Sequence, residues 1–303
     1  MIKKTLKFSA VLILILIIWF SFFKTYDHEI NFEVNVPTGT MYDILSSDIG
    51  WRKLGKELDI KDKVVFKSFI QDIKINNTPF ELQWKFENKN DTNAVVHLNL
   101  LNKKNSLAER YKCLFRTSEH LDSLVLISQA FKTKANTFAT AFKIEINGKD
   151  TIPAQTYLYV DEQSKRDRKA GKMIKSNGQL FAKNRDSLVT KTGETFVYVQ
   201  NWDLDTDDIQ FRYAFPVKPQ ESYPEDDKVK VGQMNKRPAL KATFYGNYSL
   251  SDQAWLALYN YAERQNIPIE LTPIEVFYNN PMLGGDDRLW RAEVFMPLKK
   301  SSE

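Results

Sequence analysis

Apolar and polar residues alternate along several short stretches of the chain, and many of these stretches end at a proline. In residues 28–37 (HEINFEVNVP), every second position is apolar: Ile30, Phe32, Val34 and Val36. Alternation with a period of two predicts a β-strand with one buried face. Residues 291–300 (RAEVFMPLKK) have the same pattern, with one carboxylate, Glu293, in the middle of the predicted strand. The presence of a carboxylate in the middle of a predicted half-buried strand needs an explanation.

The pattern of apolar and polar residues between positions 27 and 146 predicts a strand, two short helices, a run of antiparallel strands and a long helix. The two short helices are indicated by apolar residues at helical spacing: Met41, Ile44, Leu45, Trp51 and Leu54. The strand-like runs cover residues 63–75, 79–88 and 93–104. Residues 118–142 carry an apolar face of a long helix.

Two later windows repeat one order of elements. Residues 154–217 and 238–298 each predict a strand, a helix, a strand, a turn-rich loop and a last strand. The two windows close in a similar way, at Pro216 and Pro297. Residues 218–233 form a linker that leads into another strand. The charged run at residues 164–175 predicts a solvated helix face.

The sequence of the N-terminal segment predicts a membrane anchor. Residues 8–23 contain no charged residue, and lysines stand on both sides of the run. The run ends in Trp-Phe-Ser-Phe-Phe-Lys, which does not suit the small-residue cleavage site of a signal peptide. We therefore expect a single-pass, uncleaved transmembrane helix over residues 1–26. The lysines before it place the N-terminus in the cytoplasm and the rest of the chain in the periplasm or another extracytoplasmic space.

Composition narrows the function classes. The 303 residues suffice for two domains, and the net charge of +5 is spread along the chain rather than gathered in a block. We therefore expect no nucleic-acid partner. Cys113 and the three histidines lack the spacing of a zinc site, and no nucleotide-binding glycine motif is present. We expect neither a metal nor a cofactor.

Residues 30–51 (INFEVNVPTGTMYDILSSDIGW) and the NSLAERY segment at residues 105–111 resemble the START-like superfamily, also called SRPBCC or polyketide-cyclase-like. The resemblance covers residues 27–146. It implies a helix-grip fold, in which a curved sheet wraps around the long helix and often encloses an apolar cavity. A filled structural core is the alternative for this region.

The second window resembles the GyrI-like effector-binding family. The resemblance rests on four stretches: FYGNY (residues 244–248), AWLALYNYAERQNI (254–267), IEVFYNNP (274–281) and LWRAEVFMPL (289–298). It implies that residues 147–303 form one α+β domain, in which two repeats related by a pseudo-twofold form a cleft. The whole chain is thus similar to START-like plus GyrI-like fusion proteins with an N-terminal anchor, and its fold class is α+β.

The GyrI-like resemblance implies a functional role for Glu293. In the family, the acid at this position lies in the ligand site, where it meets cationic aromatic ligands, and in a hydrolytic subgroup it helps to activate water. Strand alternation turns Glu293 and Phe295 toward the cleft and Val294 and Met296 toward the helix. The expected aromatic walls of the cleft are Tyr245, Tyr248, Tyr278 and Trp290.

Arg212 occupies the position of Glu293 in the first repeat. Three roles of Glu293 therefore stay open: contact with a ligand, a structural pair with Arg212 across the cleft, and catalysis.

The leading hypothesis is a membrane-anchored protein that binds a small amphipathic or aromatic molecule in the GyrI-like cleft. One alternative is a hydrolase of small reactive compounds that uses Glu293, the one candidate catalytic residue. The other is a structural or partner-binding envelope protein. We expect a binding protein rather than an enzyme, because the sequence offers no nucleophile and base to accompany Glu293. Protein partners are not indicated.

Overall fold

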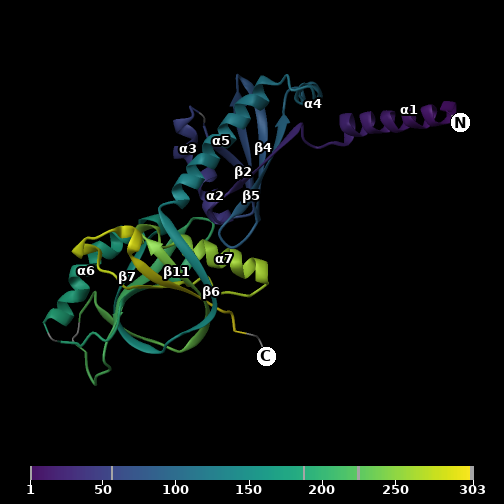
Figure 1. Cartoon of the computed structure of the whole chain (residues 1–303). Coiled ribbons are helices and arrows are strands. Elements are labelled where there is room, and N and C mark those ends of the chain that lie inside the picture. The colour runs from purple at the N-terminus through teal and green to yellow at the C-terminus, as the bar shows by residue number, and fades with distance from the viewer. Residues whose placement is uncertain (1, 56, 187, 224–225, 301–303) are drawn as a thin grey trace. The chain divides into compact units, whose positions relative to one another are not determined.

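The computed structural model describes residues 2–55, 57–186, 188–223 and 226–300. The chain divides into two compact units (Figure 1). The first comprises residues 1–34, 41–87 and 94–135, and the second comprises residues 35–40, 88–93 and 136–303. Each unit has a β-sheet of its own.

The N-terminal segment is helical. Helix α1 (Ile2–Ile18) continues into a π-helical turn, η1 (Trp19–Phe23). In the part of the chain that the structure describes, no helix has both the length and the apolar character needed to cross a membrane. The structure therefore lends no support to the transmembrane helix predicted for residues 1–26.

The first unit contains a five-stranded antiparallel sheet with the order β1-β5-β4-β3-β2. Its strands are β1 (His28–Val34), β2 (Asp59–Val64), β3 (Ser68–Ile75), β4 (Thr78–Asn88) and β5 (Ala94–Asn102). The predicted run at residues 63–75 is in fact two strands, because the chain turns after Val64 and Phe66 takes a positive φ of 62°. Burial alternates along β5, as expected for a sheet with one covered face.

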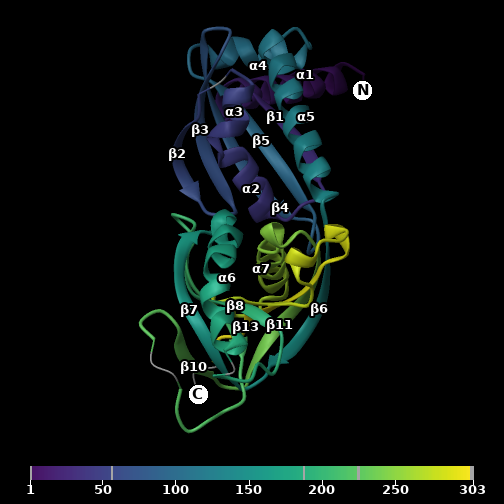
Figure 2. The same cartoon turned by 90° about the vertical axis from the view of Figure 1, so that its left-hand side faces the viewer.

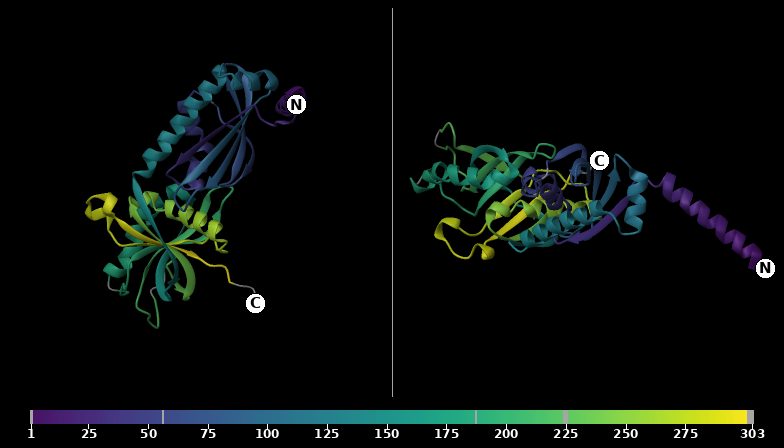
Figure 3. Two further views of the ribbon diagram at one scale, coloured as in Figure 1. Left: turned by 45° about the vertical axis from the view of Figure 1, so that its right-hand side comes forward. Right: turned by 90° about the horizontal axis from the view of Figure 1, so that it is seen from above.

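Four helices accompany this sheet: α2 (Thr38–Ser46), α3 (Asp48–Lys53), α4 (Ser106–Leu114) and α5 (Glu119–Ala139). Figure 3 shows the long helix α5 running along one face of the sheet. The rings of Trp51 on α3 and Phe131 on α5 lie 4.8 Å apart, and Trp51 also packs on Trp84 of β4 at 6.2 Å. Large aromatic side chains thus fill the space between helices and sheet. The START-like assignment of this unit stays a prediction.

The second unit contains an eight-stranded antiparallel sheet with the order β10-β7-β9-β8-β12-β13-β11-β6. Its strands are β6 (Phe142–Ile152), β7 (Gln155–Lys165), β8 (Thr195–Asp203), β9 (Asp208–Pro216), β10 (Lys230–Met234), β11 (Arg237–Gly246), β12 (Ile274–Phe277) and β13 (Arg291–Pro297). The longest continuous segment of this unit begins at residue 136, and β6 crosses the predicted boundary at residue 147.

The two predicted repeats are the core of this unit. The first is β7, α6 (Lys169–Arg185), β8 and β9, and the second is β11, α7 (Gln253–Gln265), β12 and β13. Figure 2 shows α6 and α7 on the same face of the sheet. Short 3-10 turns complete the unit: η2 (Arg166–Arg168), η3 (Tyr248–Leu250), η4 (Pro281–Leu283) and η5 (Asp287–Leu289). Each half therefore consists of a strand, a helix and two further strands, in that order.

The sheet has two different faces. Val294 and Met296 of β13 are fully buried, and β13 contacts α7. The opposite face carries an apolar cluster of Ile152, Tyr157, Tyr159, Phe196, Ala214, Met234, Ala239, Ile274 and Phe295. We call it the cleft face, because Phe295 and Glu293 share it by strand alternation. The candidate site lies on this face.

Candidate functional site

A hollow of about 380 Å³ opens on the cleft face and contains part of the predicted site. Three of the seven predicted residues line it: Glu293, Phe295 and Tyr278. Glu293 and Phe295 project from β13, and Tyr278 follows the last residue of β12. Strand alternation therefore brings these side chains to one face, as the sequence predicts.

Glu293 is surrounded by donors. The hydroxyl of Tyr278 donates to Oε2 of Glu293 at 2.9 Å. The ammonium of Lys241 lies 3.1 Å from Oε1, and the guanidinium of Arg291 also donates to that oxygen. The side chain of Glu293 is only 12% exposed. Its negative charge is thus balanced at close range by two cations.

Tyr278 is held as a neutral donor. Burial, and then the hydrogen bond to Glu293 and the charge of that carboxylate, raise the pKa of Tyr278 to about 12. The Arg291 guanidinium lies 4.3 Å from the centre of the Tyr278 ring. Glu293, Tyr278, Lys241 and Arg291 therefore form one connected group at the wall of the hollow, which we call the Glu293 group.

The proposed structural pair between Glu293 and Arg212 is wrong. Arg212 instead donates to the hydroxyl of Tyr157 at 2.8 Å, lies 3.5 Å from Asp161 and stacks at 4.3 Å from the ring centre of Tyr159. The physical reason is the strand order. Strands β12 and β8 lie between β13, which carries Glu293, and β9, which carries Arg212.

The remaining predicted walls do not line the hollow. Tyr248 is only 4% exposed, and its hydroxyl donates to the carbonyl of Arg291 at 2.7 Å. Its ring packs on Phe277 at 4.7 Å and on Trp290 at 5.5 Å. Tyr245 pairs with Arg291 in the sheet register, near the end of β11. Tyr248 thus supports the backbone of β13, as a loop-shaping residue would.

Sequence reasoning missed three charged residues that line the hollow: Lys241, Asp150 and Glu194. Lys241 lies on β11, directly opposite Phe295 of β13, and its ammonium is also 3.3 Å from Asp150. The alternation of Lys241 and Thr243 with Ala242 and Phe244 would have placed Lys241 on the cleft face. Glu194 precedes β8, in a loop that the pattern could not position.

Glu194 differs from the other acids of the hollow. Among the residues that the structure describes, no cation pairs with its exposed carboxylate, whereas Asp150 and Glu293 both pair with Lys241. Glu194 is close enough to contribute to the raised pKa of Tyr278. It is therefore the carboxylate of this hollow that remains available to a ligand.

The arrangement suits binding better than acid–base chemistry. Two cations and a phenol hydroxyl already occupy both carboxylate oxygens of Glu293. No cluster of three or more His, Cys, Asp or Glu side chains suited to a metal ion occurs in residues 2–300 outside the undescribed positions. Glu293 thus serves in this hollow as an acceptor of hydrogen bonds and ion pairs.

Comparison with known proteins gives the family of the second unit. Residues 149–299 match the family described as GyrI-like small molecule binding domain. No curated protein matches the chain.

Three solved structures illustrate the similarity. The EcmrR C-terminal domain is 14% identical and has a TM-score of 0.44, over 52% of this chain and 98% of that one. SAV2435 bound to tetraphenylphosphonium is 11% identical (TM-score 0.35; 51% and 94%). A hydrolase from Listeria innocua is 10% identical (TM-score 0.34; 52% and 92%).

The repeat order, the sheet and the family match agree on one assignment. Residues 149–299 of this chain form a GyrI-like small molecule binding domain.

Proposed function

We propose that the hollow beside Glu293 binds a small aromatic molecule that carries a positive charge. The observation that carries this proposal is Glu194, an exposed carboxylate on the hollow without an ion-pair partner among the described residues. The other charges of the site balance one another within the Glu293 group and Asp150. A ligand would therefore meet a net negative rim, which favours a cation.

The interior of the hollow supplies the apolar part of the binding surface. Phe196, Phe295, Ile274 and Val276 line it, and they belong to or pack against the apolar cluster of the cleft face. A volume of about 380 Å³ lies in the range of about 300–1,000 Å³ typical of small-molecule sites. In this proposal the Glu293 group forms part of the wall of the hollow, and Glu194 interacts with the positive charge of the ligand.

A charge series on one aromatic ring tests the proposal. The compounds are 1-naphthylmethyl-trimethylammonium, 1-naphthalenemethanol and 1-naphthalenesulfonate. We expect the cation to raise the melting temperature of the chain in a dose-dependent way and to bind about 3–5-fold more tightly than the neutral alcohol, as one exposed charge pair allows.

Two substitutions locate the binding site. Glu194→Gln should remove the preference for the cation, whereas Glu221→Gln, which removes an exposed acid of the linker, should preserve it. If the cation binds no better than the alcohol, or if both variants behave alike, the proposal is wrong.

Membrane attachment and extracytoplasmic location stay separate proposals that rest on the uncharged run at residues 8–23. Alkaline extraction of membranes tests them: the full chain should stay in the pellet, and a chain beginning at residue 27 should be released. Release of both would refute the anchor.

A further inference from the structure

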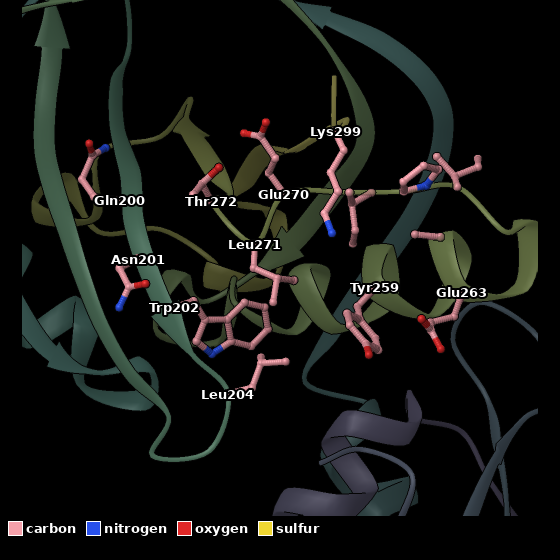
Figure 4. A pocket seen from close by; sticks show the side chains of 14 residues that line it. Gln200, Asn201, Trp202, Leu204, Tyr259, Glu263, Glu270, Leu271, Thr272 and Lys299 are labelled. Carbon is pink, nitrogen blue, oxygen red and sulfur yellow. The ribbon is translucent and has the colours of Figure 1, made fainter. Parts of the chain in front are cut away.

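A second hollow, of about 550 Å³, lies in the same unit where β8 and β12 part (Figure 4). The two strands pair from Thr195 and Phe277 to Tyr198 and Ile274, and the amide of Val199 donates to the carbonyl of Pro273 at 3.0 Å. A bulge after Val199 then changes the direction of β8. The second hollow shares no lining residue with the hollow beside Glu293.

Its floor is a fixed aromatic ring. Trp202 is 4% exposed, and its indole nitrogen donates to Asp207 at 3.1 Å. The same indole packs edge-on against Trp255 of α7, with ring centres 5.4 Å apart. Leu204 and Leu271 stand beside it (Figure 4). Leu204 and Leu271, together with the small exposed part of Trp202, would give an apolar molecule a rigid surface, at little cost in side-chain ordering.

The charges at the rim favour an anion. The carboxylate of Glu270 lies 3.0 Å from the guanidinium of Arg237, and Glu263 is engaged in an interaction of its own. The ammonium of Lys299 has no ion-pair partner in the described part of the chain, and Figure 4 shows it pointing into the hollow. Among the described residues of this rim, Lys299 is therefore the charged side chain that has no partner.

We propose that this second hollow is a binding site for a small aromatic anion, such as an aromatic carboxylate or sulfonate. The ring would lie against Trp202 and Leu271, and the acid group would meet the ammonium of Lys299. This goes beyond the proposed function, because the site is separate from the Glu293 hollow and takes a ligand of the opposite charge.

Calorimetric titration of the full chain with the same three naphthalene compounds tests the inference. We expect 1-naphthalenesulfonate to bind about 3–5-fold more tightly than 1-naphthalenemethanol, the size of effect that one exposed ion pair supplies. Lys299→Met should remove this difference. Lys300→Met, which removes an equal charge from a neighbour that does not line the hollow, should leave it unchanged.

A second variant tests the location independently of charge. Leu271→Trp places a larger side chain in the hollow and should weaken the sulfonate and the alcohol alike, while circular dichroism and the melting temperature verify folding. Glu194→Gln should leave sulfonate binding unchanged, so that failure at one hollow is separable from failure at the other. Three outcomes overturn the inference: no sulfonate binding, equal loss in Lys299→Met and Lys300→Met, or full binding by the folded Leu271→Trp chain.

Discussion

At the scale of single residues, two carboxylates of the same hollow differ in their partners: one is paired with cations and the other is not. Glu293 accepts from a phenol and two cations, so its charge is satisfied before any ligand arrives. Glu194 lies in the same hollow, exposed and without a cation partner among the described residues. Because a charged group that is already paired gains little from another partner, the site that we propose would discriminate between ligands through Glu194 rather than through Glu293.

The phenol of Tyr278 leads to a prediction about alkaline stability. Its folded-state pKa of about 12 lies above the ordinary value of 10.0, because burial and the Glu293 carboxylate both oppose the phenolate. The stability that Tyr278 contributes by keeping its proton in the folded chain is therefore fully present below pH 10. It is lost as the pH rises from 10 through 12. We expect the chain to unfold at a lower urea concentration at pH 11.5 than at pH 9.

Absorbance at 295 nm should show phenols that ionise late in the folded chain and earlier in urea. Burial also raises the pKa of Tyr213 and Tyr248 to about 12, so Tyr278→Phe should remove one late-ionising phenol and leave the others. An unchanged titration curve in Tyr278→Phe would contradict this account of Tyr278.

At the scale of elements, the first residue of α6, Lys169, forms a buried ion pair that the local sequence pattern does not predict. Residues 164–175 predict a solvated helix face, but Lys169 is only 1% exposed. Its ammonium pairs with Glu275 of β12, which is fully buried, and lies 4.7 Å from the ring centre of Trp255. Glu275 is 106 residues away, so no local pattern could have indicated that this lysine has a buried partner.

Removal of one partner of this pair should be costly. Burial raises the pKa of Glu275, and Lys169 is the cation that compensates for it. We expect Lys169→Met to lower the free energy of unfolding by about 3–5 kcal/mol, because it leaves a buried carboxylate without its partner. The double variant Lys169→Met/Glu275→Leu should recover most of that loss, measured by urea unfolding. Equal losses in the single and double variants would mean that the pair itself is not the cause.

The elements differ in how far the sequence predicts them. Strong alternation and a repeated order located β7, β8, β9, β11, β12, β13 and the two helices, because a half-buried strand and an amphipathic helix each impose a period. Strand β6 was missed, although Phe142, Ile144 and Ile146 alternate with polar residues. The long helix predicted for residues 118–142 takes in Phe142, and the domain boundary predicted at residue 147 divides the strand.

At the scale of the whole molecule, the second unit is built from two halves in the same order. From the centre of its sheet outward, β12, β13, β11 and β6 on one side correspond to β8, β9, β7 and β10 on the other. The sequence indicated the repeat, but it did not show that the halves join through β8 and β12. That join separates Arg212 from Glu293, so the hypothesis of a pair between them failed for a reason of topology, not of chemistry.

Two sheets with separate apolar interiors predict two separable stabilities. Leu98 of β5 is fully buried in the first unit, and Phe211 of β9 is 1% exposed in the second. Truncation of either to alanine should destabilise its own unit by about 2–5 kcal/mol, through lost apolar burial and a cavity. Hydrogen exchange with peptide resolution should therefore show faster exchange only in β1–β5 for Leu98→Ala and only in β6–β13 for Phe211→Ala. If either variant accelerates exchange equally in both sheets, the chain unfolds as one cooperative body, and ligand-induced stabilisation measured by melting would report on the whole chain rather than on the GyrI-like domain.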